Sequence, residues 1–152
     1  MNAVINTSAL SSFIRAKAAG LLKLLFDEII VPEGVLEELS EKYRPPSWFT
    51  VYTLNNRQKK RASYLGLGKG ESQAIILAKD LKTYLIIDER RARNVAKKLS
   101  IKVIGTAGIL KKLYEECLID YNRWRQILDI IIKDQYWSPK IREYVLSAKK
   151  NS

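Results

Sequence analysis

The side chains of this chain that could carry chemistry are mostly carboxylates. Histidine is absent, and Cys117 is the only cysteine. A Ser-His-Asp triad, a Cys-His pair and a zinc site with histidine ligands are therefore excluded, because each needs residues that the sequence lacks. Any acid–base or metal chemistry must use carboxylates, lysines, tyrosines or hydroxyls.

Several of these polar residues directly follow apolar runs that are typical of buried strands, and the others lie in helices predicted beside them. The positions are Asn6–Ser8, Glu38, Glu71, Asp88–Glu89 and Thr106. In an open parallel sheet, ligands bind at the carboxyl ends of the strands. We therefore expect these positions to converge on one crevice, although they are far apart in the sequence.

Carboxylates that converge without histidine favour a hard cation with oxygen ligands, and Mg²⁺ or Mn²⁺ fits this description. Such an ion polarises a phosphoryl oxygen and activates water. The net charge of +11 favours a polyanionic partner, above all nucleic acid. Together these features indicate phosphodiester hydrolysis, although a solvated, lysine-rich surface explains the charge equally well.

The apolar pattern predicts that strands and helices alternate along the chain. Continuous apolar runs predict strands at 3–5, 28–31, 84–87 and 101–104, with an edge strand within 48–54. Residues with helical spacing separate them, and they predict a helix through Leu25, a helix at 55–64, a helix opened by Glu71, a helix at 89–99 and a helix through Leu113. The fold class is therefore α/β, with a parallel sheet of four to five strands and helices on both faces.

We expect a single domain over residues 1–152, with a core at 1–116 and C-terminal helices at 117–152. No apolar run approaches the roughly 18 residues of a membrane span. The first residues, MNAVINTSAL, lack the basic start and apolar stretch of a signal peptide. We therefore expect a cytoplasmic protein without a membrane partner.

Five segments in this order make the chain similar to a known family. They are Val4-Ile5-Asn6-Thr7-Ser8, Val31-Pro32 with Val35 and Glu38-Leu39, Leu67–Glu71 with Ala74, Ile87-Asp88-Glu89-Arg90 with Ala92-Arg93, and Ile104-Gly105-Thr106 with Gly108 and Leu110. The sequence resembles a PIN-domain protein, from the nuclease family that includes the VapC toxins, and in particular an archaeal and bacterial VapC-like subgroup. The resemblance implies a three-layer, Rossmann-like sandwich.

The resemblance also implies a metal-dependent ribonuclease site with Mg²⁺ or Mn²⁺. Its metal-binding carboxylates would be Glu38 and Asp88 in the first place, with Glu71 and Glu89 as further ligands or water-positioning groups, and with Asn6 as an amide ligand. The residues expected to support the site are Ser8, Thr106, Arg90 and Arg93. The partners implied are RNA, a second copy of the chain and an antitoxin protein.

Asn6 departs from the family pattern, which usually has aspartate at the end of the first strand. An amide coordinates Mg²⁺ through its oxygen but supplies no negative charge. This departure leaves open a second hypothesis, a catalytically weak PIN-fold module that binds RNA or protein. A DNA-processing nuclease would use the same residues.

Each candidate residue also has a structural explanation. Asn6 and Asp88 could be helix N-caps, and Glu71 could complement a helix dipole. Glu38 lies between Glu37 and Glu41, which is typical of a solvated helix face.

Other features of the sequence are less specific. Lys59, Lys60 and Arg61 could contact an RNA backbone or simply face solvent. The glycines between 66 and 70 match no phosphate-binding loop and indicate a connection into the helix of Glu71. The stripe of Tyr121, Trp124 and Leu128 predicts core packing, with a dimer contact as the alternative.

Overall fold

A computed structural model describes residues 1–39 and 41–150 of the chain. Ser40 and the last two residues of the expected domain lie outside the described residues.

The strands form one five-stranded sheet in the order β3-β2-β1-β4-β5. They are β1 (Asn2–Ile5), β2 (Glu28–Pro32), β3 (Thr50–Tyr52), β4 (Tyr84–Ile86) and β5 (Val103–Ile104). Every neighbouring pair is parallel. The predicted parallel sheet is therefore confirmed, and the strand predicted within 48–54 is its edge strand β3.

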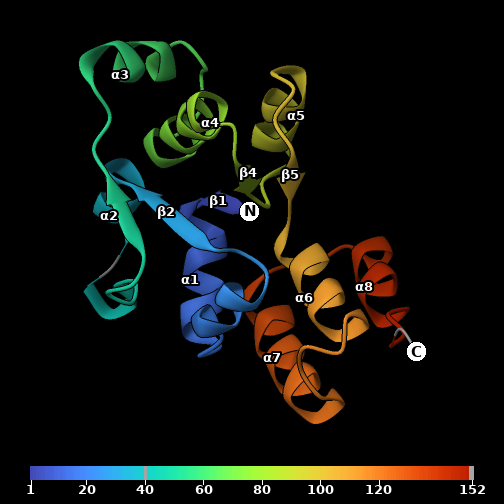
Figure 1. Cartoon of the computed structure of the whole chain (residues 1–152). Coiled ribbons are helices and arrows are strands. Elements are labelled where there is room, and N and C mark those ends of the chain that lie inside the picture. Colours follow the sequence, from blue (N-terminus) through green and yellow to red (C-terminus); the bar gives the residue numbers. More distant parts are fainter. Residues whose placement is uncertain (40, 151–152) are drawn as a thin grey trace.

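Helices alternate with the strands and then continue alone to the end of the chain (Figure 1). Their bounds are α1 (Thr7–Arg15), η1 (Ala19–Leu24), α2 (Glu33–Glu38), η2 (Glu41–Tyr43), α3 (Asn56–Ser63), α4 (Lys69–Leu81), α5 (Arg90–Lys98), α6 (Thr106–Glu115), α7 (Tyr121–Asp134) and α8 (Pro139–Leu146). Elements η1 and η2 are 3₁₀ helices.

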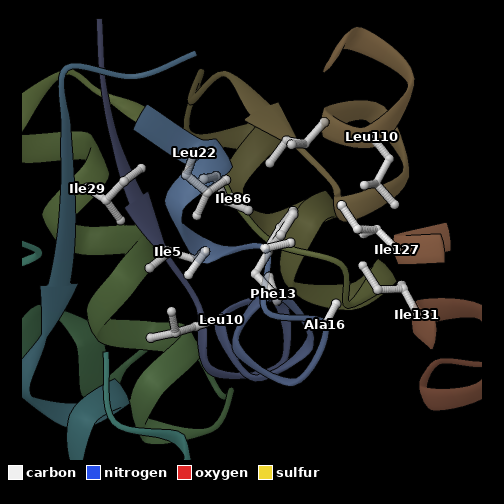
Figure 2. Packing of buried hydrophobic residues seen from close by; sticks show 14 of the residues in the cluster. Ile5, Leu10, Phe13, Ala16, Leu22, Ile29, Ile86, Leu110, Ile127 and Ile131 are labelled. Atoms are coloured by element: carbon white, nitrogen blue, oxygen red, sulfur yellow. The ribbon is translucent and has the colours of Figure 1, made fainter. Parts of the chain in front are cut away.

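The two faces of the sheet are covered by different helices, because side chains alternate along a strand. Ile5 and Ile86 belong to a core cluster with residues of α1, α6 and α7, as Figure 2 shows for Phe13, Leu110 and Ile127. Val4, Leu85 and Ile87 belong to a second cluster with residues of α4 and α5. The chain is thus a three-layer α/β sandwich, as the sequence predicts.

The C-terminal helices pack on the α1 and α6 side of the molecule (Figure 1). On α7, Trp124 is buried and donates a hydrogen bond from Nε1 to the Leu110 carbonyl of α6 at 2.9 Å. Asp120 caps the start of α7, and Ser138 caps α8, which opens with Pro139. None of the helices among the described residues is long and apolar enough to cross a membrane.

Two helix boundaries differ from the prediction. The helix expected through Leu25 ends at Arg15, after which Lys17 takes a left-handed conformation (φ 54°) and the chain continues as η1. Glu71 does not open its helix, because α4 begins two residues earlier at Lys69. Both differences arise where local backbone geometry, rather than apolar spacing, sets the end of a helix.

Candidate functional site

The carboxyl ends of the three strands β1, β4 and β5 lie side by side. The Asn6 amide donates to the Ile86 carbonyl at 3.0 Å, and the Ile87 amide donates to the Ile104 carbonyl at 3.1 Å. Asn6 follows β1 directly, and Asp88 and Thr106 lie two residues after the ends of β4 and β5. The sheet therefore brings the first, fourth and last of the predicted site segments to one edge.

Asn6 is buried at the end of β1, with 2% of its surface exposed. Its backbone takes the N-cap position of α1, but its side chain makes no capping hydrogen bond. The side-chain oxygen Oδ1 is buried and has no hydrogen-bond partner among the described residues. An orphaned oxygen of this kind costs free energy unless it binds a group from outside the chain.

Asp88 is held by the start of α6. Its Oδ1 accepts from the Thr106 amide at 2.8 Å, and its Oδ2 accepts from the Thr106 hydroxyl at 2.6 Å. A third bond comes from Gln135, whose Nε2 lies 3.2 Å from Oδ2. The N-cap of α5 is Glu89, so Asp88 caps the neighbouring helix α6 rather than its own.

Gly105 allows a close approach between Asp88 and Arg93. A Cβ atom at position 105 would lie 2.6 Å from Arg93 Nη1 and 3.0 Å from Asp88 Oδ1. The same guanidinium donates to the Ile87 carbonyl at 3.3 Å. Arg93 therefore braces the end of β4 beside Asp88, and its role in a functional site stays a prediction.

Glu38, at the end of α2, connects three helices. Its Oε2 accepts from the Thr7 hydroxyl at 2.9 Å, and its Oε1 accepts from the Gly70 amide at 2.6 Å. The approach is close, because a Cβ atom at position 70 would lie 2.8 Å from Glu38 Oε2 and 2.9 Å from Thr7 Oγ1. Glu38 is thus fixed against α1 and α4, whereas its neighbour Glu37 forms an exposed ion pair with Lys69.

Glu71 lies close enough to the carboxylates of Glu89 and Glu38 to be affected by their negative charges. Burial raises the pKa of its carboxyl group, and the charges of Glu89 and Glu38 raise that pKa further, against the opposing charge of Arg91. Three of the predicted acidic residues therefore share one electrostatic environment.

The predicted residues do not all meet. Residues 1–39 and 41–150 contain no group of three or more acidic or cysteine side chains placed to hold a metal ion. Ser8 Oγ is buried without a partner in the described part of the chain, and its neighbour Thr7 makes the contact to Glu38. Arg90 lines a cavity together with Asp88 and Arg93.

The basic residues of α3 are tied to neighbouring helices. Lys59 pairs with Glu33 of α2 at 3.0 Å, and Arg61 pairs with Asp80 of α4 at 2.8 Å. Lys60 is exposed. These contacts support a structural role for Lys59 and Arg61, and RNA binding by the segment stays a prediction.

Three residues of the site were not predicted from the sequence. Thr7 stands in the same motif as Ser8, and its hydroxyl, not that of Ser8, makes the contact to Glu38; a role for Ser8 stays a prediction. Gly70 was treated only as part of a connection. Gln135, which ends α7, has no sequence signal that relates it to Asp88, 47 positions earlier.

The donor set fits a divalent cation in its chemistry. Mg²⁺ binds through one or two carboxylates and keeps several waters, so it needs no cluster of three protein carboxylates. The buried, unpartnered Asn6 oxygen and the repelling carboxylates Glu38, Glu71 and Glu89 would each be stabilised by a cation.

Comparison with known proteins gives one match. A family model for the PIN domain matches residues 2–150, nearly the whole chain. Neither a curated protein nor a solved structure matches the chain.

Proposed function

Because this chain belongs to the PIN-domain family, we propose that it is a Mg²⁺- or Mn²⁺-dependent endoribonuclease of the VapC-like toxin type. PIN domains are in general nucleases that depend on divalent metals and act on nucleic acid. The subgroup, the ion and the RNA substrate belong to the proposal.

The observation that carries the proposal is the buried Asn6 oxygen. It lies at the end of the central strand β1 without a hydrogen-bond partner in the described part of the chain. On one side of β1, Asp88 follows strand β4; on the other, strand β2 leads into the helix that ends in Glu38. A buried oxygen without a hydrogen-bond partner, at the end of the strand that separates these two segments, supports the assignment of Asn6 as a cation ligand.

The residues that we assign as candidate ligands are Asn6, Glu38, Asp88 and Glu89, and a cation that keeps several waters would take one or two of these carboxylates. When bound, the ion would supply charge stabilisation to a phosphoryl oxygen and lower the pKa of a water molecule. Thr106 fixes both oxygens of Asp88, and Arg93 braces the strand end behind it.

Two further groups would act on the substrate and the water. Glu71 lies near Glu38 and Glu89, whose charges add to burial in raising the pKa of its carboxyl group, and we assign it to positioning the attacking water. Arg90, exposed in the first turn of α5, is available to a phosphate oxygen.

Cleavage of RNA by the purified protein tests this proposal. We expect cleavage with Mg²⁺ or Mn²⁺ and none with chelator, and a loss of at least about 100-fold in Asp88→Asn, which keeps an oxygen for the Thr106 amide. Asp129→Asn on α7 is the matched control, because Asp129 makes only an exposed ion pair with Arg125. Undiminished cleavage in Asp88→Asn would overturn the assignment of the site.

The second candidate is a catalytically weak PIN-fold module that binds RNA or protein. Two observations favour it: position 6 is an amide, and the carboxylates of Glu38 and Asp88 are already bound by protein donors. Calorimetry distinguishes the candidates. The absence of Mn²⁺ or Mg²⁺ binding at millimolar concentration would favour the binding module.

The proposal includes a cytoplasmic homodimer with an antitoxin protein as a further partner. Light scattering should give twice the 17.5 kDa mass of the chain. RNA and DNA oligonucleotides of the same sequence, compared in the cleavage assay, separate the ribonuclease from a DNA-processing enzyme that would use the same residues.

A further inference from the structure

A cavity of about 450 Å³ lies beside the proposed site. It is lined by Asp88 after β4, by strand β5, by the first turns of α5 and α6, by the connection between α7 and α8, and by residues of α8. Asp88 belongs to this lining, so the cavity adjoins the strand-end residues directly.

The polar wall of the cavity carries two arginines. Arg90 and Arg93 stand one turn apart on α5 and both line the cavity beside Asp88. This wall is positively charged, because it carries two guanidinium groups and only one carboxylate, that of Asp88, which Thr106 already binds. Such a wall suits a phosphate group.

Another part of the lining is aromatic. Tyr136, Trp137 and Tyr144 line it, and Ile141 adds apolar surface. Trp137 is buried, but 90% of Tyr136 and 50% of Tyr144 are exposed. Lys111 lies over the Tyr144 ring at 4.1 Å, whereas no described ring or cation lies on Tyr136.

The connection that carries Tyr136 is held in place next to Asp88. Gln135 donates to Asp88 Oδ2 at 3.2 Å and to Ser12 Oγ at 2.6 Å, and its Oε1 accepts from Trp137 Nε1 at 3.0 Å. Tyr136 stands between these two anchored residues. The fold thus fixes the backbone of an exposed aromatic residue whose ring packs against little of the protein.

We propose that this cavity binds one unpaired base of an RNA strand, with Tyr136 as its stacking platform and with Arg90 and Arg93 on the adjoining phosphate. The inference rests on the proposed ribonuclease function and deepens it, because it makes the substrate a single-stranded segment. The volume is within the range of small-molecule sites. A base in a duplex is stacked and paired, so it cannot enter, whereas an unpaired base stacks on aromatic side chains.

Binding of a labelled short oligoadenylate, followed by fluorescence anisotropy in the presence of chelator, tests the inference without cleavage. We expect Tyr136→Ala to weaken binding by about tenfold, because base–aromatic stacking is lost. Tyr136→Phe, which keeps the ring, should bind within about twofold of the original chain. Tyr64→Ala is the matched control, because Tyr64 is 75% exposed at the end of α3 and does not line the cavity.

Three results would overturn the inference. The first is wild-type affinity in Tyr136→Ala, which would leave the cavity to a peptide or to no ligand. The second is an equal loss of affinity in Tyr64→Ala. The third is binding of a duplex of the same length as tightly as the single strand. The assay also separates the two proposals. Unchanged binding in Tyr136→Ala, in a protein that cleaves RNA with metal, refutes only the base site. Weaker binding in Tyr136→Ala, in a protein that shows no metal-dependent cleavage, refutes only the ribonuclease.

Discussion

At the scale of single residues, the site depends on how three oxygen-bearing side chains are satisfied. Glu38 and Asp88 each accept hydrogen bonds from helix N-termini, whereas the Asn6 oxygen has no partner among the described residues. A buried polar group of this kind costs about 1–3 kcal/mol if nothing binds it. In the proposed site, the amide would offer an oxygen ligand without adding a negative charge to those of the carboxylates.

Asn6→Asp should restore the charge that most PIN domains have at this position. We expect Mn²⁺ to bind about tenfold more tightly, because a carboxylate attracts the ion more strongly than an amide does. The metal-free protein should in turn be less stable, because the new charge is buried beside Glu38 and Asp88. Calorimetric titration and thermal unfolding measure the two effects.

Asn122→Asp, an exposed substitution on α7, is the control for the same change of charge. An equal gain in metal affinity in both variants would mean that net charge, not ligation at position 6, controls binding. No gain in Asn6→Asp would remove Asn6 from the proposed ligands.

Residue types predicted which side chains belong to the site better than they predicted the contacts. Asn6, Asp88 and Thr106 follow strands whose apolar runs are plain in the sequence, so their meeting could be predicted. The choice between Thr7 and Ser8 could not, because the rotation of α1 about its axis decides which hydroxyl faces Glu38.

At the scale of elements, the end of α7 supports the site through Gln135. This residue joins Asp88 to Ser12 of α1, and Ser12 also donates to Asp134, which pairs with Arg15. The network links α1 and α7 to the start of α6. A partner that orients a ligand carboxylate contributes to metal binding although it does not touch the ion.

Gln135→Leu should therefore lower metal-dependent cleavage by about 10–100-fold. Weaker metal affinity should accompany the loss, because Asp88 keeps its bonds to Thr106 but loses one that fixes its orientation. Gln126→Leu, an exposed substitution on the same helix, is the matched control. Full activity in Gln135→Leu, with the helix content unchanged by circular dichroism, would show that this support is unnecessary.

The contact between α3 and α4 gives the protein a pH dependence remote from the site. Burial tends to raise the pKa of Asp80, but hydrogen bonds from Gln58 and Arg61, with the charges of Arg61 and Arg57, outweigh it and hold the pKa below its usual value. A depressed carboxylate pKa stabilises the fold above the pKa of the unfolded chain, about 4. That stabilisation is lost as the pH falls through the lower pKa of the folded protein.

Asp80→Asn should thus destabilise the protein at pH 7, by less than about 1 kcal/mol because the pair is largely exposed. The difference from the original chain should shrink as the pH falls below about 4. Urea unfolding at several pH values measures it, with Asp129→Asn as the exposed control. A difference that stays constant down to pH 2 would contradict the role assigned to Asp80.

Apolar periodicity predicted the elements well because most of them bury a face. It failed at η1, where the chain turns at Lys17 and the apolar residues are buried without an α-helix. It also placed the start of α4 too late. Gly70 is needed there so that the Glu38 carboxylate can approach the backbone amide of residue 70. The spacing of apolar residues does not predict such a contact.

At the scale of the whole molecule, the net charge of +11 acts on any nucleic acid before specific contacts form. Affinity for single-stranded RNA should fall steeply with salt. If four to six phosphates are contacted, the logarithm of the association constant should fall with the logarithm of the salt concentration at a slope of about −3 to −4. Anisotropy titrations at several salt concentrations measure it, and a slope near zero would contradict electrostatic binding.

The sheet and its layers could be predicted because continuous apolar strands separated by helices have few other arrangements. The position of α7 and α8 could not. Their packing depends on contacts between residues far apart in sequence, such as Gln135 with Ser12 and Trp124 with Leu110. For the same reason, no sequence pattern predicted the cavity that Tyr136 and Arg90 share.

The claim that most needs a direct test is that the ends of β1 and β4 form one metal site. A crystal soaked in Mn²⁺ and measured for anomalous scattering tests it. We predict a peak within about 2–2.5 Å of Asn6 Oδ1 and of a carboxylate oxygen of Asp88 or Glu38. A well-ordered crystal with no peak at these residues, or with Mn²⁺ bound only elsewhere on the surface, would contradict the account.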